Sequence, residues 1–435
     1  MPPSFPKVVL IPVLVGLLTL YAVMLVFATR SLSSACVDAM QRWHLSPHDP
    51  QLTAELHRVC HHIAAATPLN VTEREASSSA PALPDTPPLR VFRGAAVTEA
   101  DIVAYNASMP LNCADFQSSA LRYVDAVPFA RGFSKAAWRA MWNGRSLVVK
   151  RPAVLTSDTK SAEALRRDFA FAVKQELKFF MYLGRHPNVI EYYGSCIANL
   201  SGSGGETALA VEGPLVAWHA VVSSRQLGWS ARLHLALQLL QLLELLASSR
   251  LVHCDWKADQ IAVTFDLRVK LVDLKSLRYH GSASTPWMSQ KACASDGDCS
   301  GDCFKWLFQN NFDVPHQRCD AERGRCRGLD ASSMLHASAQ IAFWPLLDKY
   351  RADAPAQRAP AFAQQVELLL SNMLLDRADV WNATSVRRLV ERVYAEFDAA
   401  ADFAARRQES ERVVRQAGLA FWNTADTRCT ANRFC

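Results

Sequence analysis

The stretch from Leu251 to Leu277 gathers charged and amide side chains around one short hairpin, and it constrains the fold more than any other part of the chain. Two β-prone runs, residues 261–265 and 269–273, flank a short turn, a pattern typical of a β-hairpin. The polar side chains lie in the preceding loop and at the end of the second run: His253, Asp255, Lys257, Gln260 and Asp273. This set suits phosphoryl transfer, because one carboxylate can orient or deprotonate a hydroxyl while the other carboxylate and the amide hold Mg²⁺ against phosphate oxygens.

The spacing of these residues resembles that of protein kinases, in which the catalytic loop H-R-D-x-x-x-x-N precedes a metal-binding D-F-G in the next hairpin. Here H-C-D at 253–255 stands for H-R-D, Gln260 for the Asn, and D-L-K at 273–275 for D-F-G. The chain departs from the pattern at three places: Cys for Arg, Gln for Asn, and Leu-Lys for Phe-Gly. Taken alone, the stretch is also compatible with a hairpin that merely carries solvated charges.

The strand pattern before this loop extends the resemblance. Residues 123–152 predict three strands, and an Asn143-Gly144 pair between the last two is a strong hairpin signal. Lys150 closes the third strand after Leu-Val-Val, at the place of the phosphate-pairing lysine of V-A-I-K.

The loop expected to cover the phosphates has few glycines. Kinases use G-x-G-x-x-G there so that bare backbone amides can approach the phosphates. This chain has only Gly132, while Ala130 and Lys135 stand at the outer glycine positions. Gly132 is the candidate for nucleotide binding, and Lys135 could either touch phosphate or point to water.

A helix is predicted over residues 161–184, where apolar residues recur at helical spacing. It carries Glu176 and runs into H-P-N-V-I at 186–190, which resembles the segment that follows the kinase C-helix. The resemblance implies that Glu176 pairs with Lys150 and holds it towards phosphate. The alternative is an ordinary surface glutamate.

Later segments complete the outline of two lobes. Strands are predicted at 191–196 and 208–212, and residues 212–215 are expected to form the hinge between lobes. A long helix is predicted over 229–248, with a polar stripe that argues against a membrane span. Further helices are expected over residues 335–350, 362–375 and 385–416.

A cysteine-rich insert follows where kinases have an activation loop, and no A-P-E motif is found. Its five cysteines are Cys293, Cys299, Cys303, Cys319 and Cys326. They predict disulfides rather than zinc, since their spacings do not form two C-x-x-C knuckles. Because five is odd, one cysteine must pair elsewhere, with Cys429 or Cys435 as candidates. Three aspartates in the insert also raise the alternative of calcium, but the loop lacks EF-hand spacing.

The N-terminus predicts a membrane anchor. Residues 8–29 carry no charge and are long enough to span a bilayer. All twelve cysteines follow this segment, and Cys36 and Cys60 are a possible pair. Four glycosylation sequons also follow it: Asn70, Asn106, Asn199 and Asn382. Together they favour a body in the oxidising lumen, a short cytoplasmic tail at 1–7, and a stem at 30–90.

The net charge of +6 is spread along the chain, so no nucleic-acid partner is expected.

The anchor, H-C-D, D-L-K and the C-x-x-D-x-D-C of the insert together resemble the divergent protein kinase domain family of the endoplasmic reticulum and Golgi, relatives of the secreted vertebrate lonesome kinase. The resemblance covers about residues 91–435 and implies an α+β, two-lobed kinase-like fold. The β-rich N-lobe would span about 91–213, the α-rich C-lobe about 214–435, and the disulfide-rich insert 293–326. The protein would be a single-pass type II membrane protein of either compartment.

Two functions from different classes follow. The first is an ATP- and Mg²⁺- or Mn²⁺-dependent kinase acting on luminal or secreted proteins or their glycans. The resemblance implies these roles: phosphate binding by Lys150 held by Glu176, hydroxyl orientation by Asp255, and metal binding by Gln260 and Asp273. The second is a pseudokinase that serves as a luminal binding or regulatory module. A non-kinase adhesion protein is a third, weaker hypothesis.

Overall fold

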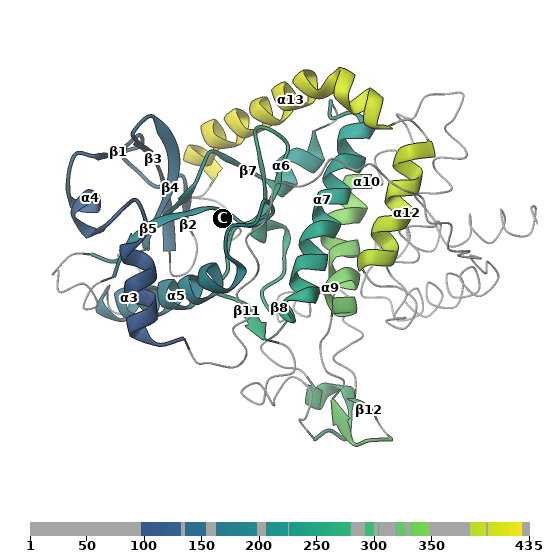
Figure 1. Cartoon of the computed structure of the whole chain (residues 1–435), viewed down its shortest axis with the longest axis horizontal. Coiled ribbons are helices and arrows are strands. Elements are labelled where there is room, and N and C mark those ends of the chain that lie inside the picture. The colour runs from purple at the N-terminus through teal and green to yellow at the C-terminus, as the bar shows by residue number, and fades with distance from the viewer. Residues whose placement is uncertain are drawn as a thin grey trace, which may run out of the picture.

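The computed structural model describes residues 97–131, 135–153, 162–197, 206–224, 226–279, 292–299, 303, 319–320, 322–326, 331–347, 383–396 and 399–428. They form two lobes, with the sheet-rich lobe at the left of Figure 1 and the helical lobe at the right. The mixed α and β, two-lobed architecture predicted from the sequence is confirmed. The expected tail, membrane segment and stem lie outside the described residues. In the part of the chain that is described, no helix combines the length and apolarity needed to cross a bilayer.

The N-terminal lobe is built on an antiparallel sheet in the order β1-β3-β4-β6-β5, with β2 also paired to β3. Its strands are β1 (Leu121–Tyr123), β2 (Ala130–Arg131), β3 (Lys135–Trp142), β4 (Arg145–Pro152), β5 (Tyr192–Cys196) and β6 (Ala208–Glu212). Helix α5 (Ala162–Leu183) contacts β4 and buries an apolar stripe that includes Phe169, Val173 and Leu177. The strands and the helix predicted for this lobe are therefore present.

The turn between β3 and β4 shows why this hairpin could be predicted. Asn143 and Gly144 both have positive φ, 47° and 76°. A two-residue hairpin loop needs this backbone to match the right-handed twist of its strands, and Asn-Gly tolerates it best. The turn sets the register that places Ala137 of β3 opposite Lys150 of β4.

Two short helices pack on the N-terminal lobe, the first against α5 and the second against β1 and β5. Helices α3 (Glu99–Ala107) and α4 (Cys113–Gln117) each begin with a capping box, which satisfies backbone amides that have no partner inside the helix. A disulfide joins Cys113, the first residue of α4, to Cys196, the last residue of β5. This bond fixes α4 to the edge of the sheet.

The C-terminal lobe is arranged around helix α7 (Trp229–Ser248), whose bounds equal the predicted ones. One small sheet contains β7 (Leu215–Ala217), β9 (Ile261–Thr264) and β10 (Val269–Leu271), and another pairs β8 (Leu251–His253) with β11 (Leu277–Tyr279). The other helices are α6 (Trp218–Ser223), α9 (Ala331–Ser338), α10 (Trp344–Leu347), α12 (Ala383–Glu396) and α13 (Ala399–Arg428). The expected hinge, residues 212–215, connects β6 to β7 and contains a cis Gly213–Pro214 bond.

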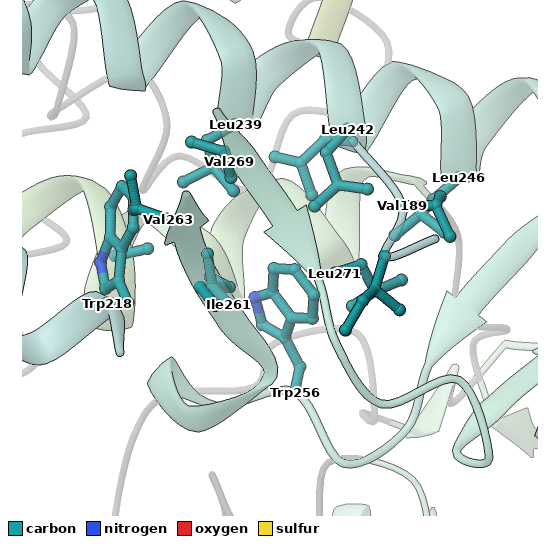
Figure 2. Packing of buried hydrophobic residues seen from close by; sticks show 14 of the residues in the cluster. Val189, Trp218, Leu239, Leu242, Leu246, Trp256, Ile261, Val263, Val269 and Leu271 are labelled. Atoms are coloured by element: carbon teal, nitrogen blue, oxygen red, sulfur yellow. The ribbon is translucent and has the colours of Figure 1, made fainter. Parts of the chain in front are cut away.

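Helix α7 forms the base on which the predicted hairpin rests. Leu239, Leu242 and Leu246 point from α7 towards Val269 and Leu271 of β10 (Figure 2). All five side chains are fully buried, and burial of each such side chain contributes about 1.5–3 kcal/mol to stability. The packing fixes the β9–β10 hairpin, and with it the loops at both of its ends.

The C-terminal helices differ from the prediction in their continuity. The helix expected over 335–350 is α9 and α10 joined by a π-helical turn, Ala339–Phe343. The helix expected over 385–416 is two helices, α12 and α13, each packed on α7 and on one another. The helix expected over 362–375 lies outside the described residues.

Candidate active site

A buried ion pair lies where the sheet of the N-terminal lobe faces helix α5. Lys150 Nζ of β4 is 3.0 Å from Glu176 Oε2 of α5. The same ammonium donates to the carbonyl of Val272, 2.9 Å away, just before Asp273. The side chains of Lys150 and Glu176 are 9% and 1% exposed. Burial lowers the pKa of Lys150, and the Glu176 carboxylate opposes that shift. The structure thus brings together the two residues expected to pair.

The loop after β8 holds a second group of predicted site residues. Asp255 Oδ2 accepts from the Gln260 side-chain amide at 3.0 Å and lies 3.2 Å from Lys257 Nζ. A short 3₁₀ turn, Ala258–Gln260, brings Gln260 back towards Asp255. The Gln260 carbonyl then accepts from the Val272 amide at 3.0 Å. These bonds fix the loop against Val272, the residue that follows β10.

His253 connects the same loop to the end of the hairpin. Its Nε2 lies 2.7 Å from the carbonyl oxygen of Asp273, and its side chain is fully buried. Burial lowers the pKa of His253, which favours the neutral imidazole. A neutral ring with its proton on Nε2 donates to this carbonyl, so His253 fixes the backbone at Asp273.

Three lysines surround the carboxylate of Asp273. Lys135 Nζ lies 2.6 Å from Asp273 Oδ2 and 3.5 Å from Glu176 Oε1. Lys275 Nζ lies 3.8 Å from Asp273 Oδ2. Burial alone would raise the pKa of Asp273, but Lys135, Lys275 and Lys150 outweigh it and hold the pKa below its usual range. The carboxylate is therefore ionised, with the Lys135 ammonium in direct contact with its Oδ2 atom.

Two of these contacts were not foreseen from the sequence. The sequence is compatible with Lys135 on phosphate or in solvent, whereas the structure pairs it with Asp273. The strand register could have indicated where Lys135 points. Lys135 is two residues before Ala137, and Ala137 pairs with Lys150 across the strands. Side chains two residues apart on a strand share one face.

The disulfides of the insert follow the prediction in part. Cys293 is bonded to Cys319 and Cys299 to Cys326. The odd cysteine of the insert, Cys303, is bonded to Cys254 in the loop after β8, and this corrects the expectation of Cys429 or Cys435. Disulfide pairing depends on which cysteines the fold brings close together, and the sequence motif shows Cys254 only as the residue at the Arg position of H-R-D.

Three cysteine sulfurs of the insert lie close enough together to resemble a metal site. The sulfurs of Cys293, Cys299 and Cys319 lie within 4.8 Å of one another. All three belong to disulfides, so none offers the thiolate that a metal needs. The prediction of disulfides over zinc holds for this group.

The remaining predicted site residues fall in two classes. Gly132, Asn70, Asn199 and Asn382 lie outside the described residues. Asn106 is in α3, where its Nδ2 donates to the Ser195 carbonyl at 2.9 Å and its Oδ1 accepts from the Ser195 amide at 3.0 Å. The Asn106 side chain therefore joins α3 to β5.

The donor set fits a nucleotide with a divalent cation. Asp273 supplies an ionised carboxylate, and Gln260, which uses its amide nitrogen on Asp255, has a side-chain oxygen of the kind that Mg²⁺ and Mn²⁺ prefer. Lys150, buried beside Glu176, is a fixed cation of the kind that binds phosphate.

Comparisons with known proteins agree with this geometry. No curated protein matches the chain. A family model, that of the protein-kinase domain of FAM69, matches residues 169–326. The matched range contains Glu176, Asp255, Gln260 and Asp273 and runs to the last cysteine of the insert, while Lys150 precedes it. The chain therefore carries a kinase-like domain similar to that of FAM69, a divergent kinase family.

Proposed function

We propose that this chain is an active luminal kinase that transfers the γ-phosphoryl group of ATP to a hydroxyl of a secretory-pathway protein or glycan. One observation carries the proposal: the buried Lys150–Glu176 pair and the loop that carries Asp255 are both bonded to Val272, the residue before the ionised Asp273. A chain that only bound a partner would have no need of this combination of buried charges, which is costly to bury unless each is paired.

The position of each side chain in the site indicates its role in phosphoryl transfer. Lys150, held by Glu176, binds phosphate oxygens, and Gln260 and Asp273 hold the cation. Asp255 is 34% exposed at its side chain, so an acceptor hydroxyl can reach it and pass its proton to it. Lys257, 3.2 Å from Asp255, places a positive charge where negative charge develops on the transferred group. Bound ATP with Mg²⁺ or Mn²⁺ would supply the phosphoryl group itself.

A pseudokinase is the second candidate, and Lys135 favours it. Its ammonium lies against the carboxylate that a metal would use, and three positively charged side chains already balance Asp273. A protein that binds nucleotide without metal, or a luminal regulatory module without nucleotide, would have this arrangement. The direct test is transfer of label from γ-labelled ATP, with Mg²⁺ or Mn²⁺, by the purified body and its Asp273→Ala variant.

Lys150 and Asp273 should differ in how their replacement affects nucleotide binding. Lys150→Met should weaken ATP binding with or without metal, because an ammonium neutralises phosphate directly. Asp273→Ala should remove only the metal-dependent part, because a carboxylate repels phosphate unless a cation lies between them. Thermal shift in EDTA and in Mg²⁺ measures both, since ligand at 100 times its Kd stabilises by about 2.7 kcal/mol. No shift of the wild type with any nucleotide and metal would leave the regulatory module as the function.

The location in the lumen is part of the proposal. It is supported by the uncharged segment 8–29 and by the four disulfides in the described part of the chain, since disulfides persist in oxidising compartments. Endoglycosidase treatment of the expressed full chain should increase its gel mobility. An unchanged mobility, with the body sensitive to protease in intact microsomes, would reverse the orientation and also the class of substrate.

A further inference from the structure

Lys135 occupies a position that the proposed function leaves unused. It is the first residue of β3, and its ammonium bridges two acidic side chains from different elements, Asp273 at 2.6 Å and Glu176 at 3.5 Å. Its side chain is 20% exposed, against 9% for Lys150. Lys135 therefore reaches the buried carboxylates from the solvent side of the site.

The sheet explains why the lysine points there. Lys135 and Ala137 are on the same face of β3, and Ala137 is paired with Lys150 across the strands. The small Ala137 side chain leaves room beside Lys150, so the Lys135 side chain can extend along the same face. The lysine stands where a glycine of the phosphate loop is expected, so a side chain replaces bare backbone at the end of β3.

The contact with Asp273 opposes the binding of a metal to the same oxygen. Two unit charges 4 Å apart repel by about 4 kcal/mol at the effective dielectric of a protein surface, and a divalent ion repels more. A cation bound to Asp273 Oδ2 would lie beside an ammonium only 2.6 Å from that oxygen. This repulsion favours the departure of one of the two cations, and a lysine on its flexible four-carbon stem can move away.

We propose that Lys135 is a tethered cation that holds the metal position of Asp273 until nucleotide arrives, and that it then moves onto the phosphates. The second step rests on the proposed function, and the first does not. Before nucleotide binds, the ammonium balances Asp273 and Glu176 and keeps metal affinity low. Phosphate oxygens offer it a new partner, so nucleotide and metal bind cooperatively, each raising the affinity of the other by the same factor.

The first experiment titrates Mn²⁺ alone into the folded luminal body and follows binding by calorimetry or by the signal of free Mn²⁺. Lys135→Met should bind Mn²⁺ at least about tenfold more tightly than wild type, since about 1.4 kcal/mol is tenfold and the relieved repulsion exceeds that. Asp273→Asn added to Lys135→Met should abolish the gain. Lys135→Arg keeps the charge and should keep the weak binding. Unfolding in EDTA verifies that each variant is folded.

Two further variants test whether the gain in Mn²⁺ affinity comes from removing the ammonium at Asp273 or from any loss of positive charge. Lys174→Met removes a lysine of α5 that pairs with Glu99 and should leave Mn²⁺ affinity unchanged. Lys275→Met removes the more distant ammonium, 3.8 Å from the same carboxylate, and should give a much smaller gain than Lys135→Met. Equal gains from Lys135→Met and Lys275→Met, or no gain from Lys135→Met, would overturn the inference.

The second experiment repeats the Mn²⁺ titration with a saturating non-hydrolysable ATP analogue. The analogue should raise the Mn²⁺ affinity of the wild type by a larger factor than that of Lys135→Met. If the analogue raises the Mn²⁺ affinity of both proteins by the same factor, the proposal that Lys135 moves onto phosphate is wrong. A wild type that binds no analogue would overturn the proposed function, while the result with Mn²⁺ alone still decides whether Lys135 holds the metal position.

Discussion

Asp255→Asn should lower the kcat of phosphoryl transfer by roughly 10²- to 10⁴-fold, the usual contribution of a positioned general base. The amide keeps the size of the side chain and an acceptor oxygen for Gln260 and Lys257, but it cannot take the proton of the hydroxyl. Nucleotide and metal binding should persist, because both depend on Lys150, Gln260 and Asp273. Label transfer under saturating ATP measures kcat, and thermal shift with ATP and Mg²⁺ measures binding.

Asp259 provides a matched control for this substitution. It lies four residues after Asp255 in the same loop, is 65% exposed and pairs with His219 instead of with site residues. Asp259→Asn should transfer label at nearly the rate of the wild type. If both variants lose activity equally, the loop is sensitive to charge in general, and the specific role of Asp255 is wrong.

Removal of the Cys254–Cys303 disulfide by a double alanine substitution should reduce both stability and activity. The two cysteines are 49 residues apart, and the chain-entropy model gives about 4 kcal/mol for a loop of that length. The bond also connects the loop that presents Asp255 to the insert, so the loop should lose its fixed geometry. Denaturant unfolding measures the first effect, and label transfer at low temperature measures the second.

The Cys113–Cys196 disulfide is the appropriate comparison. It closes 83 residues and should contribute a similar free energy of unfolding, about 4–5 kcal/mol. It joins α4 to β5 in the N-terminal lobe and does not involve the loop that carries Asp255. The double alanine variant of this pair should therefore be as unstable as the first but should keep its kcat while folded. A Cys254–Cys303 variant that also keeps its kcat would show that the insert does not position the loop.

Local patterns predicted most of the framework because their physics is local. The Asn143-Gly144 turn, the strand ending at Lys150 and the apolar face of the 229–248 helix each depend on a few neighbouring residues. The partner of Lys150 required more, since only the motif beside Glu176 indicated which glutamate would meet it. Residues whose roles depend on local sequence and a known spacing were therefore placed together correctly.

The features that were missed depend on distances between remote parts of the chain. Cys303 could have paired with any cysteine outside the insert, and nothing in the sequence states that Cys254 is near it. The Lys135–Asp273 contact joins residues 138 apart, and it required the strand register as well as the length of a lysine side chain. Both features involve residues at which this chain departs from the general kinase pattern, so the pattern could not indicate their partners.

The Cys254–Cys303 bond also bears on how such a kinase would be controlled. In many kinases an arginine meets a phosphate added to the activation loop, and this reversible contact orders the site. Cys254 stands at the arginine of H-R-D and is bonded covalently to the insert. A covalent bond of this kind forms once, during biosynthesis in an oxidising compartment, and no upstream kinase is needed to maintain it. We therefore expect the amount of active protein to be set by maturation and export, as for a secreted digestive enzyme, rather than by a signalling cascade.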